Sequence, residues 1–293
     1  MVVAATGFFD WVHQGHRAVL DSLKKIAAQK QMESAVITFW PHPRTVLQQD
    51  AHSLRLLNSL EEKRQRVLSL GIDHFHVVNF SREFSKLSTE EFMKEYLIDK
   101  YQVSTLVIGY DHRLGNSSLQ TQDQMRQIAA SLGLETVRVE EVHLGDKMIS
   151  STKIRAALHS GDVSGASELL GYNYHLHGVV VSGKQIGRTI GFPTANMELY
   201  EPLKMVPGNG VYLVDVDLMG RKYKGICNVG NRPTVGENQN RTIETHILDF
   251  NEDIYGLALS IDFVAKIRDE RKFASLDELR EQIAKDKEFV INS

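Results

Sequence analysis

The chain has 293 residues, which is long for one hydrophobic core and ordinary for two domains. Its hydrophobic content of 42% and charged content of 24% are typical of a globular protein, and no stretch approaches the ~18 consecutive apolar residues of a membrane span. The net charge of -3 argues against a nucleic-acid partner, which favours a basic excess.

The start of the chain and the cysteine content bear on the cellular compartment. The first residues lack a basic segment followed by an apolar one, so we expect no signal peptide. Cys227 is the only cysteine, which excludes an internal disulfide and suits a reducing environment. We therefore expect a cytoplasmic protein with no membrane association, and the sequence leaves its oligomeric state open.

The first half alternates strand and helix patterns. Capping boxes at Ser59 with Glu62 and at Ser88 with Glu91 each predict a helix start, and Gly71 and Gly133 predict helix ends. Strands are predicted at 2–5, 34–39, 74–80, 105–108 and 136–142, and further helices at 18–28 and 122–132. Such alternation predicts an α/β domain with a parallel, Rossmann-like sheet.

The segment between the first strand and the first helix, 6–16, reads Thr-Gly-Phe-Phe-Asp-Trp-Val-His-Gln-Gly-His. His13 and His16 are three apart, so they share one face of the first helical turn. Unpaired backbone N–H groups and the positive end of the helix dipole favour an anion there. This pattern predicts a cradle for nucleotide phosphates, whereas no cluster of cysteines or carboxylates lies nearby to complete a tetrahedral metal site.

Three further segments belong to this half. Residues 40–44, Trp-Pro-His-Pro-Arg, follow a strand. Their two prolines disfavour both a helix and hydrogen-bonded strand pairing, so they predict a stiff loop. Residues 109–115 form a glycine-bounded polar loop after the fourth strand. Residues 149–155, Ile-Ser-Ser-Thr-Lys-Ile-Arg, open a helix to about His159, and their hydroxyl and basic side chains suit a second anion.

The second half changes pattern after about residue 172. Alternating strands are predicted at 175–181, 210–218, 222–229, 242–250 and 257–267, followed by one helix from the cap Ser275 to about Val290. Short polar turns between them predict a closed antiparallel barrel. The loop 183–196 carries glycines and basic residues that can fold over phosphates, although its composition alone favours a mobile glycine loop without that role.

These strings resemble known families. The segment 7–16 resembles the HxGH nucleotidyltransferases, and 149–155 resembles the element that accompanies that motif in adenylyltransferases. Gly-Arg-Thr-Ile-Gly-Phe-Pro-Thr-Ala-Asn at 187–196 resembles the hallmark of riboflavin kinases, as do the segments 228–234, 242–246, 253–256 and 268–273. Nearly the whole chain is therefore similar to the bacterial bifunctional riboflavin kinase/FMN adenylyltransferase family.

The resemblance implies an adenylyltransferase domain at 1–158 and a riboflavin kinase domain at 159–293, with ATP, riboflavin and FMN as substrates and Mg²⁺ as cofactor. For the first domain it implies that ATP binds at Gly7, Phe9, Asp10, His13, His16, Ser150, Ser151, Thr152 and Arg155, and FMN at His42, Pro43 and Asp111. His13 and His16 would be catalytic.

For the second domain the resemblance implies an ATP site at Gly183, Gly187, Arg188, Thr189, Gly191, Pro193, Thr194 and Asn196, and a flavin site at Arg268, Arg271 and Phe273. Thr194 and Asn196 are two apart in extended chain, so their neutral oxygens suit Mg²⁺ that is held by nucleotide phosphates. Glu244, which shares a strand face with Thr242 and His246, would be the general base that accepts the riboflavin hydroxyl proton.

Two alternatives remain open. In the first, the second half is a riboflavin kinase and the first half binds nucleotide or flavin without turnover, because Trp11 stands where the family has glycine and 116–120 lacks the usual basic and glycine residues. In the second, the first half is a regulatory binding module. An RNA-binding barrel is disfavoured by the acidic balance.

Overall fold

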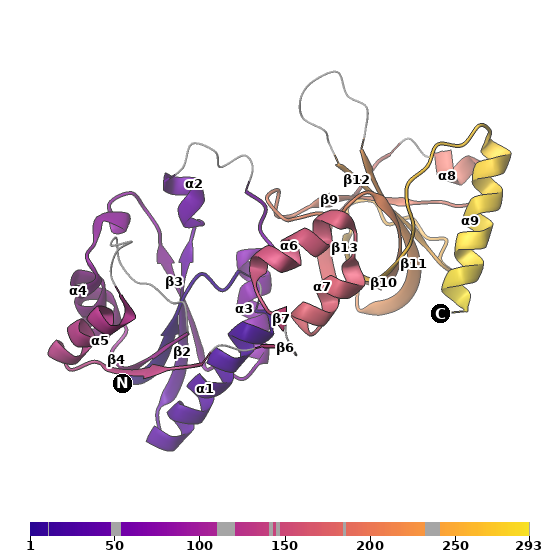
Figure 1. Ribbon diagram of the computed structural model, residues 1–293. Coiled ribbons are helices and arrows are strands. Elements are labelled where there is room, and N and C mark those ends of the chain that lie inside the picture. Colours follow the sequence, from indigo (N-terminus) through magenta and orange to yellow (C-terminus); the bar gives the residue numbers. More distant parts are fainter. Residues whose placement is uncertain are drawn as a thin grey trace. The chain divides into compact units, whose positions relative to one another are not determined.

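The computed structural model describes residues 1–10, 12–47, 54–109, 121–140, 143–144, 147–183, 186–231 and 241–292. Trp11, Asp111, the segment 116–120 and Arg232–Thr234 are among the sequence-derived features that lie outside these ranges. The chain divides into two compact units, Met1–Ser151 and Thr152–Ser293. Figure 1 shows the first unit in indigo to magenta and the second in rose to yellow.

The first unit is built on a parallel sheet of five strands in the order β3-β2-β1-β4-β5. The strands are β1 (Val2–Thr6), β2 (Glu33–Trp40), β3 (His74–Asn79), β4 (Val103–Ile108) and β5 (Glu135–Arg138). The predicted parallel α/β sheet is confirmed. The last strand is Glu135–Arg138 against the predicted 136–142; residues 139 and 140 lie beyond it, and 141 and 142 are outside the described residues.

Helices connect these strands as the sequence pattern predicts. They are α1 (Gln14–Lys30), α2 (Pro43–Leu47), α3 (Leu60–Ser69), α4 (Thr89–Glu91) and α5 (Gln122–Ser131), with a short 3₁₀ helix η2 (Phe84–Lys86) and a π-helix η3 (Phe92–Lys100). Two-residue strands β6 (His143–Leu144) and β7 (Lys147–Met148) form a small hairpin. Both predicted capping boxes are present, at Ser59 and at Ser88.

One local prediction is wrong. The segment 40–44 was predicted to be a loop without helix, but α2 begins at Pro43. Proline is excluded from the interior of a helix, where its missing N–H would be needed. At the first helical position that N–H has no partner in any case, so proline fits there.

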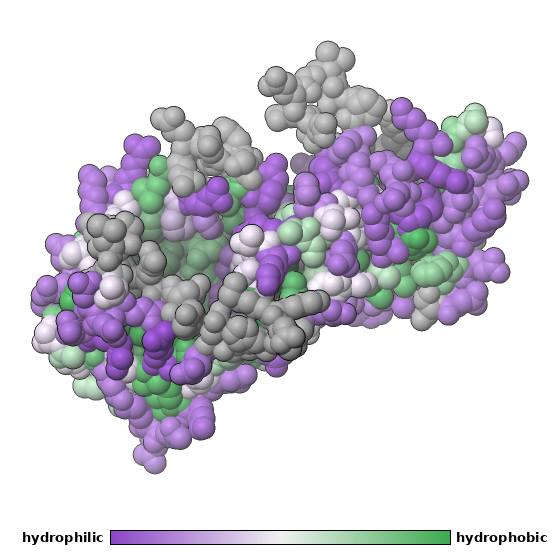
Figure 2. All heavy atoms as spheres, viewed as in Figure 1, coloured by the Kyte–Doolittle hydropathy of each residue, from purple (hydrophilic) through white to green (hydrophobic). Residues whose placement is uncertain are grey.

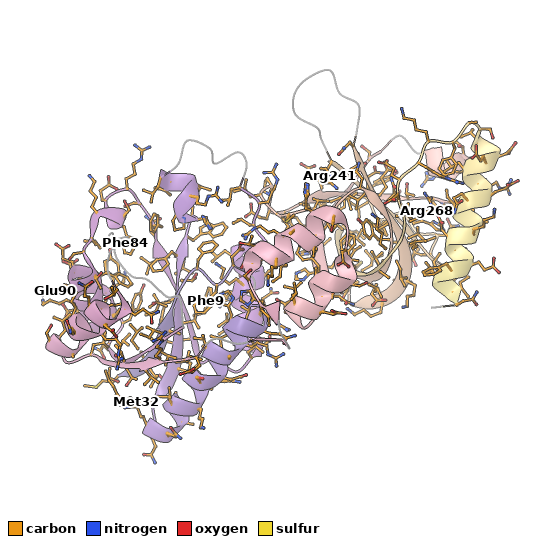
Figure 3. The ribbon with its side chains drawn as sticks, viewed as in Figure 1. Phe9, Met32, Phe84, Glu90, Arg241 and Arg268 are labelled. Atoms are coloured by element: carbon orange, nitrogen blue, oxygen red, sulfur yellow. The ribbon has the colours of Figure 1, made fainter. Side chains whose placement is uncertain are left out.

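Helices cover both faces of the sheet. On one face, α1 and α3 pack on β1, β2 and β4 through Val3, Ala5, Leu20, Leu23, Val36, Val67 and Val107. On the other face, η3 and α5 pack on the same strands through Ala4, Ile37, Met93, Leu97, Leu106 and Met125. Figure 3 labels Phe84, whose ring joins the second group at the edge of η3. Strands buried on both faces explain why their sequences are apolar runs rather than alternating patterns.

The second unit is a closed barrel with strand order β10-β11-β12-β9-β8-β13, and every neighbouring pair is antiparallel. The strands are β8 (Tyr174–Val181), β9 (Ala195–Leu199), β10 (Gly210–Leu218), β11 (Arg221–Asn231), β12 (Arg241–Ile247) and β13 (Ala258–Arg268). The helices are α6 (Ser151–Ser160), which begins at the boundary between the units, α7 (Val163–Leu170), α8 (Ile186–Thr189) and α9 (Leu276–Ile291). The predicted antiparallel barrel with a terminal helix is confirmed.

Three elements of this unit were not predicted. The sequence analysis missed α7, where the Asp162 side chain accepts a hydrogen bond from the Gly165 backbone N–H at 2.9 Å. It also missed the short α8, which interrupts the predicted helix-free region, and β9, which closes the barrel between β8 and β12. The last two residues of the Pro-Thr-Ala-Asn string, Ala195 and Asn196, begin that strand.

The interior and the outer face of the barrel have different packing. Inside, the rings of Tyr174, Tyr212 and Phe263 are fully buried, with Tyr212 and Phe263 in edge contact at 5.2 Å. Outside, Val290 of α9 packs on Val211 and Leu213.

A buried ion pair supports this docking of α9. Arg268 at the end of β13 donates Nε and a terminal nitrogen to the carboxylate of Asp286 on α9, at 2.8–3.1 Å, and Asp286 is 2% exposed. Arg268 therefore lies between the barrel and α9 (Figure 3).

The face shown in Figure 2 is mostly hydrophilic, with hydrophobic residues confined to small separate patches. Within the residues that the structure describes, no helix is both long and apolar enough to cross a membrane.

Candidate active sites

The first candidate site lies where the sheet of the first unit changes direction. β1 has β2 on one side and β4 on the other, so the loop after β1 leaves the sheet at its switch point, where ligands bind in open α/β sheets. The loop is held close to the sheet, since the Gly7 N–H donates to the Ile37 carbonyl at 3.2 Å. Phe9 has a φ of 47°, a left-handed conformation that a non-glycine residue rarely adopts.

His13 is the N-cap of α1. Its Nδ1 accepts a hydrogen bond from the His16 backbone N–H at 3.3 Å, so a neutral ring carries its proton on Nε2. The two imidazoles stack with centroids 3.9 Å apart. Burial, reinforced by the neighbouring His16, lowers the pKa of His13 to about 3. His13 is therefore a neutral hydrogen-bond donor at physiological pH, placed beside the N–H groups of the first turn of α1.

The predicted companion motif meets this loop. The Ser151 hydroxyl donates to the backbone carbonyl of Asp10 at 3.2 Å, so two segments about 140 residues apart in sequence lie together in the first unit. Asp10 is 7% exposed, and its carboxylate accepts the Leu57 N–H at 3.1 Å. Thr152 and Arg155 follow on α6, where Arg155 is four residues after Ser151 and shares its helix face.

The predicted flavin side of this site is partly described. The His42 ring stands edge-on to the Phe8 ring with centroids 4.1 Å apart, and its Nδ1 accepts the Arg44 N–H at 3.0 Å. Pro43 starts α2 next to it. Asp111, the third predicted residue, lies outside the described residues.

Lys63 is a residue that the sequence analysis missed. It is fully buried on α3, and its Nζ donates to the Phe8 carbonyl and lies 3.8 Å from the centroid of the Phe8 ring. Burial lowers the pKa of Lys63 to about 7, although the charge of Asp10 opposes that shift. A sequence signal existed, because Leu60, Lys63, Val67 and Leu70 are spaced by three, four and three residues, which puts a lysine on the apolar face of a helix.

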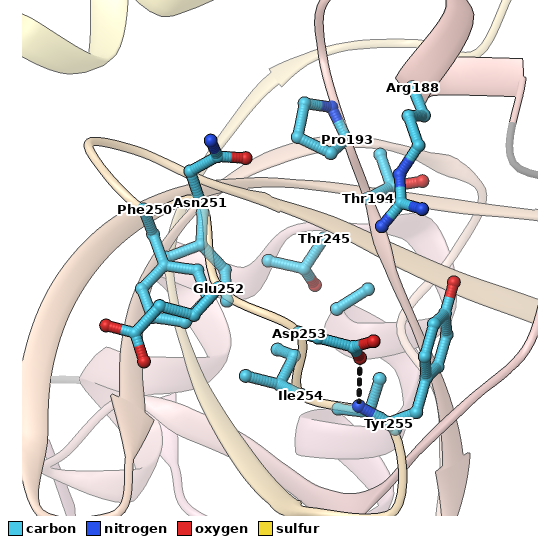
Figure 4. Close-up of a pocket in the computed structure, with 13 residues that line it drawn as sticks. Arg188, Pro193, Thr194, Thr245, Phe250, Asn251, Glu252, Asp253, Ile254 and Tyr255 are labelled. Carbon is cyan, nitrogen blue, oxygen red and sulfur yellow. Dashed lines mark hydrogen bonds between the residues drawn. The ribbon is translucent and has the colours of Figure 1, made fainter.

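The second candidate site is a cavity of about 240 Å³ in the barrel unit (Figure 4). Three predicted residues line it, namely Arg188, Pro193 and Thr194. The opposite wall is the segment Asn251–Tyr255, which contains a tight turn in which the Tyr255 N–H donates to the Asp253 carboxylate at 3.2 Å. Val180, Ala195 and Thr245 contribute from the strands. The wall 251–255 had not been assigned to the site from sequence.

Glycines shape the loop that carries Arg188. A Cβ at Gly187 would collide with the carbonyl of Phe192, and the Phe192 N–H donates to the Gly187 carbonyl at 2.8 Å. Gly191 has a φ of +86°, which disfavours any other residue. The next turn is fixed by His246, whose Nδ1 donates to the Pro193 carbonyl at 2.8 Å. The loop is thereby closed beside the cavity.

Glu244 lies on the other face of the same strands. In the barrel register it stands directly opposite Asn196 on β9 and Asn228 on β11. Ala195 and Thr245, one residue away on their strands, line the cavity instead. The predicted base and the predicted metal ligand Asn196 are therefore neighbours, whereas Asn196 is not among the residues that line the cavity. Gly183 lies against the Asn196 amide and has no room for a Cβ.

The predicted flavin residues of this unit cluster near α9. Besides its pair with Asp286, Arg268 packs its guanidinium 5.7 Å from the Phe273 ring centroid. Arg271 stacks on the same ring at 4.8 Å and donates to Gln282 at 2.7 Å. The structure brings these three residues together.

Comparison with known proteins covers both units. The sequence model of the FAD synthetase family matches residues 1–153, and that of riboflavin kinase matches residues 170–293. A Bacillus subtilis protein named bifunctional riboflavin kinase/FMN adenylyltransferase is 41% identical over 99% of this chain and 91% of its own length. Proteins of the same name from Listeria monocytogenes and Escherichia coli are 38% and 36% identical, over 98% and 97% of this chain and 90% of each relative. The chain belongs to this bifunctional family.

A solved structure has the same fold over the full length. It comes from Streptococcus pneumoniae, is described as a macrolide-efflux protein, and is 31% identical, with a TM-score of 0.92 over 100% of this chain and 94% of its own.

Family membership confirms the resemblance drawn from the sequence motifs. It also favours two activities over a kinase joined to an inactive half, since both family models match. The residue assignments within each site remain predictions. The contacts described above show which of these residues lie close together.

Proposed function

We propose that the two units carry out consecutive steps of FAD formation through the residues assigned above. In the second unit, the 5′-hydroxyl of riboflavin attacks the γ-phosphorus of ATP, giving FMN and ADP. In the first unit, a phosphate oxygen of FMN attacks the α-phosphorus of a second ATP, giving FAD and pyrophosphate. Neither step needs a covalent enzyme intermediate, so catalysis depends on positioning and on stabilisation of phosphate charge.

The adenylyl step uses the start of α1. The observation that supports this most strongly is the buried, neutral His13, whose Nε2–H can donate to a phosphate oxygen without an ionised partner. The His16 side chain and the positive end of the α1 dipole add favourable interactions around the α-phosphate. Gly7, Phe9, Asp10, Ser150 and Ser151 are the other ATP residues of this unit, and Ser151 contacts Asp10. Thr152 and Arg155 follow them in sequence, and the family resemblance assigns them to the departing pyrophosphate. On the flavin side, His42, Pro43 and Asp111 hold FMN.

The kinase step uses the cavity of the barrel. ATP would bind between the wall 251–255 and the loop of Gly183, Gly187, Arg188, Thr189, Gly191 and Pro193. The Arg188 side chain lines the cavity there, where it can meet the phosphates (Figure 4). Glu244 lies beside Asn196 on the strand face that does not line the cavity, so its role as the base that accepts the hydroxyl proton rests on the family resemblance. Arg268, Arg271 and Phe273 hold the flavin. Because Arg268 is bound to Asp286, its part is to orient the other two rather than to carry a free charge.

The donor groups fit a magnesium ion. Thr194 offers a hydroxyl, Asn196 an amide oxygen, and Glu244 stands opposite Asn196. Such neutral protein oxygens suit Mg²⁺ that is bound mainly through nucleotide phosphates. Among the described residues no three His, Cys, Asp or Glu side chains group to bind a metal by themselves. When bound, Mg²⁺ would neutralise charge on the β- and γ-phosphates.

The test is to incubate the full chain with riboflavin, ATP and Mg²⁺ and to separate FMN from FAD by chromatography. FAD supports both steps, FMN alone supports the kinase with an inactive first half, and neither product supports a binding role. His16→Ala should abolish FAD while FMN still forms, because loss of one preorganised donor costs ~10²–10³ in rate. His74→Ala, an exposed histidine on β3, is the matched control and should make FAD at the parent rate.

A further inference from the structure

Lys63 has an environment that folding alone does not require. It is a lysine with 0% exposure on α3, the helix whose Val67 belongs to the apolar cluster beneath the sheet, and Asp10 is a nearby opposite charge. Burying an amine is costly, and the depressed pKa of Lys63 reflects that cost. The hydrogen bonds of the amine offset part of this cost, and they show what the amine holds in place.

The contacts of Lys63 converge on one residue. Its Nζ donates to the Phe8 carbonyl and lies over the Phe8 ring, so it holds both the main chain and the side chain of Phe8. Thr38 on β2 is fully buried and donates to the same carbonyl at 3.2 Å, and it also lies 3.4 Å from Nζ. Lys63 and Thr38 thus form a buried clamp, the Lys63–Thr38 clamp, on the Phe8 carbonyl.

Phe8 connects the two sides of the proposed adenylyl site. Its ring meets the imidazole of His42, which we assign to FMN. Its chain continues through Phe9, in a left-handed conformation, to Asp10, which binds Leu57 and Ser151. A carbonyl that is fixed at Phe8 therefore sets where both the flavin side and the ATP side of the loop lie.

We propose that Lys63 is a positioning residue for adenylyl transfer, which acts by clamping Phe8 together with Thr38. The inference rests on the adenylyl site proposed above. Lys63 does not touch the reacting atoms. It fixes the loop Gly7–Asp10 so that FMN at His42 and ATP at the start of α1 meet in line. A displacement of the reacting groups by about 1 Å costs ~10²-fold in rate.

The experiment measures FAD formation from supplied FMN and ATP by full-length Lys63→Met, Thr38→Val, the double variant, and the control Arg64→Met. Arg64 is the exposed neighbour on α3, with a side chain 53% exposed. Lys63→Met should lower kcat for FAD formation at least tenfold. The rate of riboflavin phosphorylation should stay at the parent value, and the unfolding midpoint followed by tryptophan fluorescence should be unchanged or higher. Both tryptophans, Trp11 and Trp40, belong to the first unit. Arg64→Met should match the parent.

A double-mutant cycle tests the clamp itself. If both side chains act through the Phe8 carbonyl, the double variant should lose less than the product of the single losses. FAD formation at the parent rate in Lys63→Met overturns the proposal. The proposal is also overturned if Lys63→Met loses FAD formation only because its first unit unfolds, while Thr38→Val stays folded and forms FAD at the parent rate. If His16→Ala also leaves FAD formation unchanged, the site assignment fails and the proposal falls with it.

Discussion

His13 provides the sharpest quantitative test of the adenylyl site. Its pKa lies near 3 in the folded chain against about 6.5 for a free imidazole. Between these values the unfolded chain binds a proton that the folded chain does not, so stability is complete above pH ~6.5 and falls as the pH drops toward 3. Each pH unit in that window costs about 1.4 kcal/mol, on the order of 5 kcal/mol in all.

The assay is urea unfolding of the full chain at pH 7.5 and at pH 5, followed by tryptophan fluorescence, which reports the first unit because both tryptophans lie there. The parent should lose about 2 kcal/mol more than His13→Gln between the two pH values. Loss of the helix cap lowers the stability of His13→Gln by a similar amount at both pH values, about 1 kcal/mol, so it cancels in the comparison. Equal pH dependence of the two proteins would refute a neutral, buried His13.

The remaining predictions concern the barrel unit. Glu244→Gln should lose roughly 10²–10⁴ in kcat for FMN formation while FAD still forms from supplied FMN, and phosphorylation at the parent rate would exclude Glu244 as the base. Gly187→Ala should raise the KM for ATP in the kinase assay alone, because a Cβ there meets the Phe192 carbonyl; an unchanged KM would contradict a closed loop. Asp286→Asn should lower the unfolding free energy of the barrel by ~1–3 kcal/mol, since it removes the charge that pairs with the partly buried Arg268, and circular dichroism would show the change.

Much of the fold could be predicted because local chemistry determines it. The Ser59 and Ser88 capping boxes need only side chains three residues apart, and both formed as predicted. The change from helical to two-residue periodicity after about residue 172 marks the start of the barrel. In contrast, β9 begins inside a glycine- and proline-rich string whose composition favours a loop, and it is a strand because β8 and β12 pair with it.

The sites were predictable only where a motif is continuous in sequence. The segment 7–16 is such a motif, and its His13 cap follows from its place before α1. The cavity wall 251–255 and the Lys63–Thr38 clamp could not be assigned in this way, because tertiary contact creates them. Phe8, Thr38 and Lys63, for example, are 25 to 55 positions apart in the sequence. Lys63 could have been noticed as a charge on an apolar helix face, but its partner Phe8 could not.

The two sheets differ in how they end, and this has a consequence for self-association. The six described strands of the barrel close on themselves, so each has a neighbour on both sides. The first sheet ends in β3 and β5, whose outer backbone groups can pair with another chain. β5 has four residues, whereas β3 has six, with Val77 40% exposed. Aggregation of partly unfolded chains should therefore begin along β3, and a lysine at Val77 should suppress it without touching either active site.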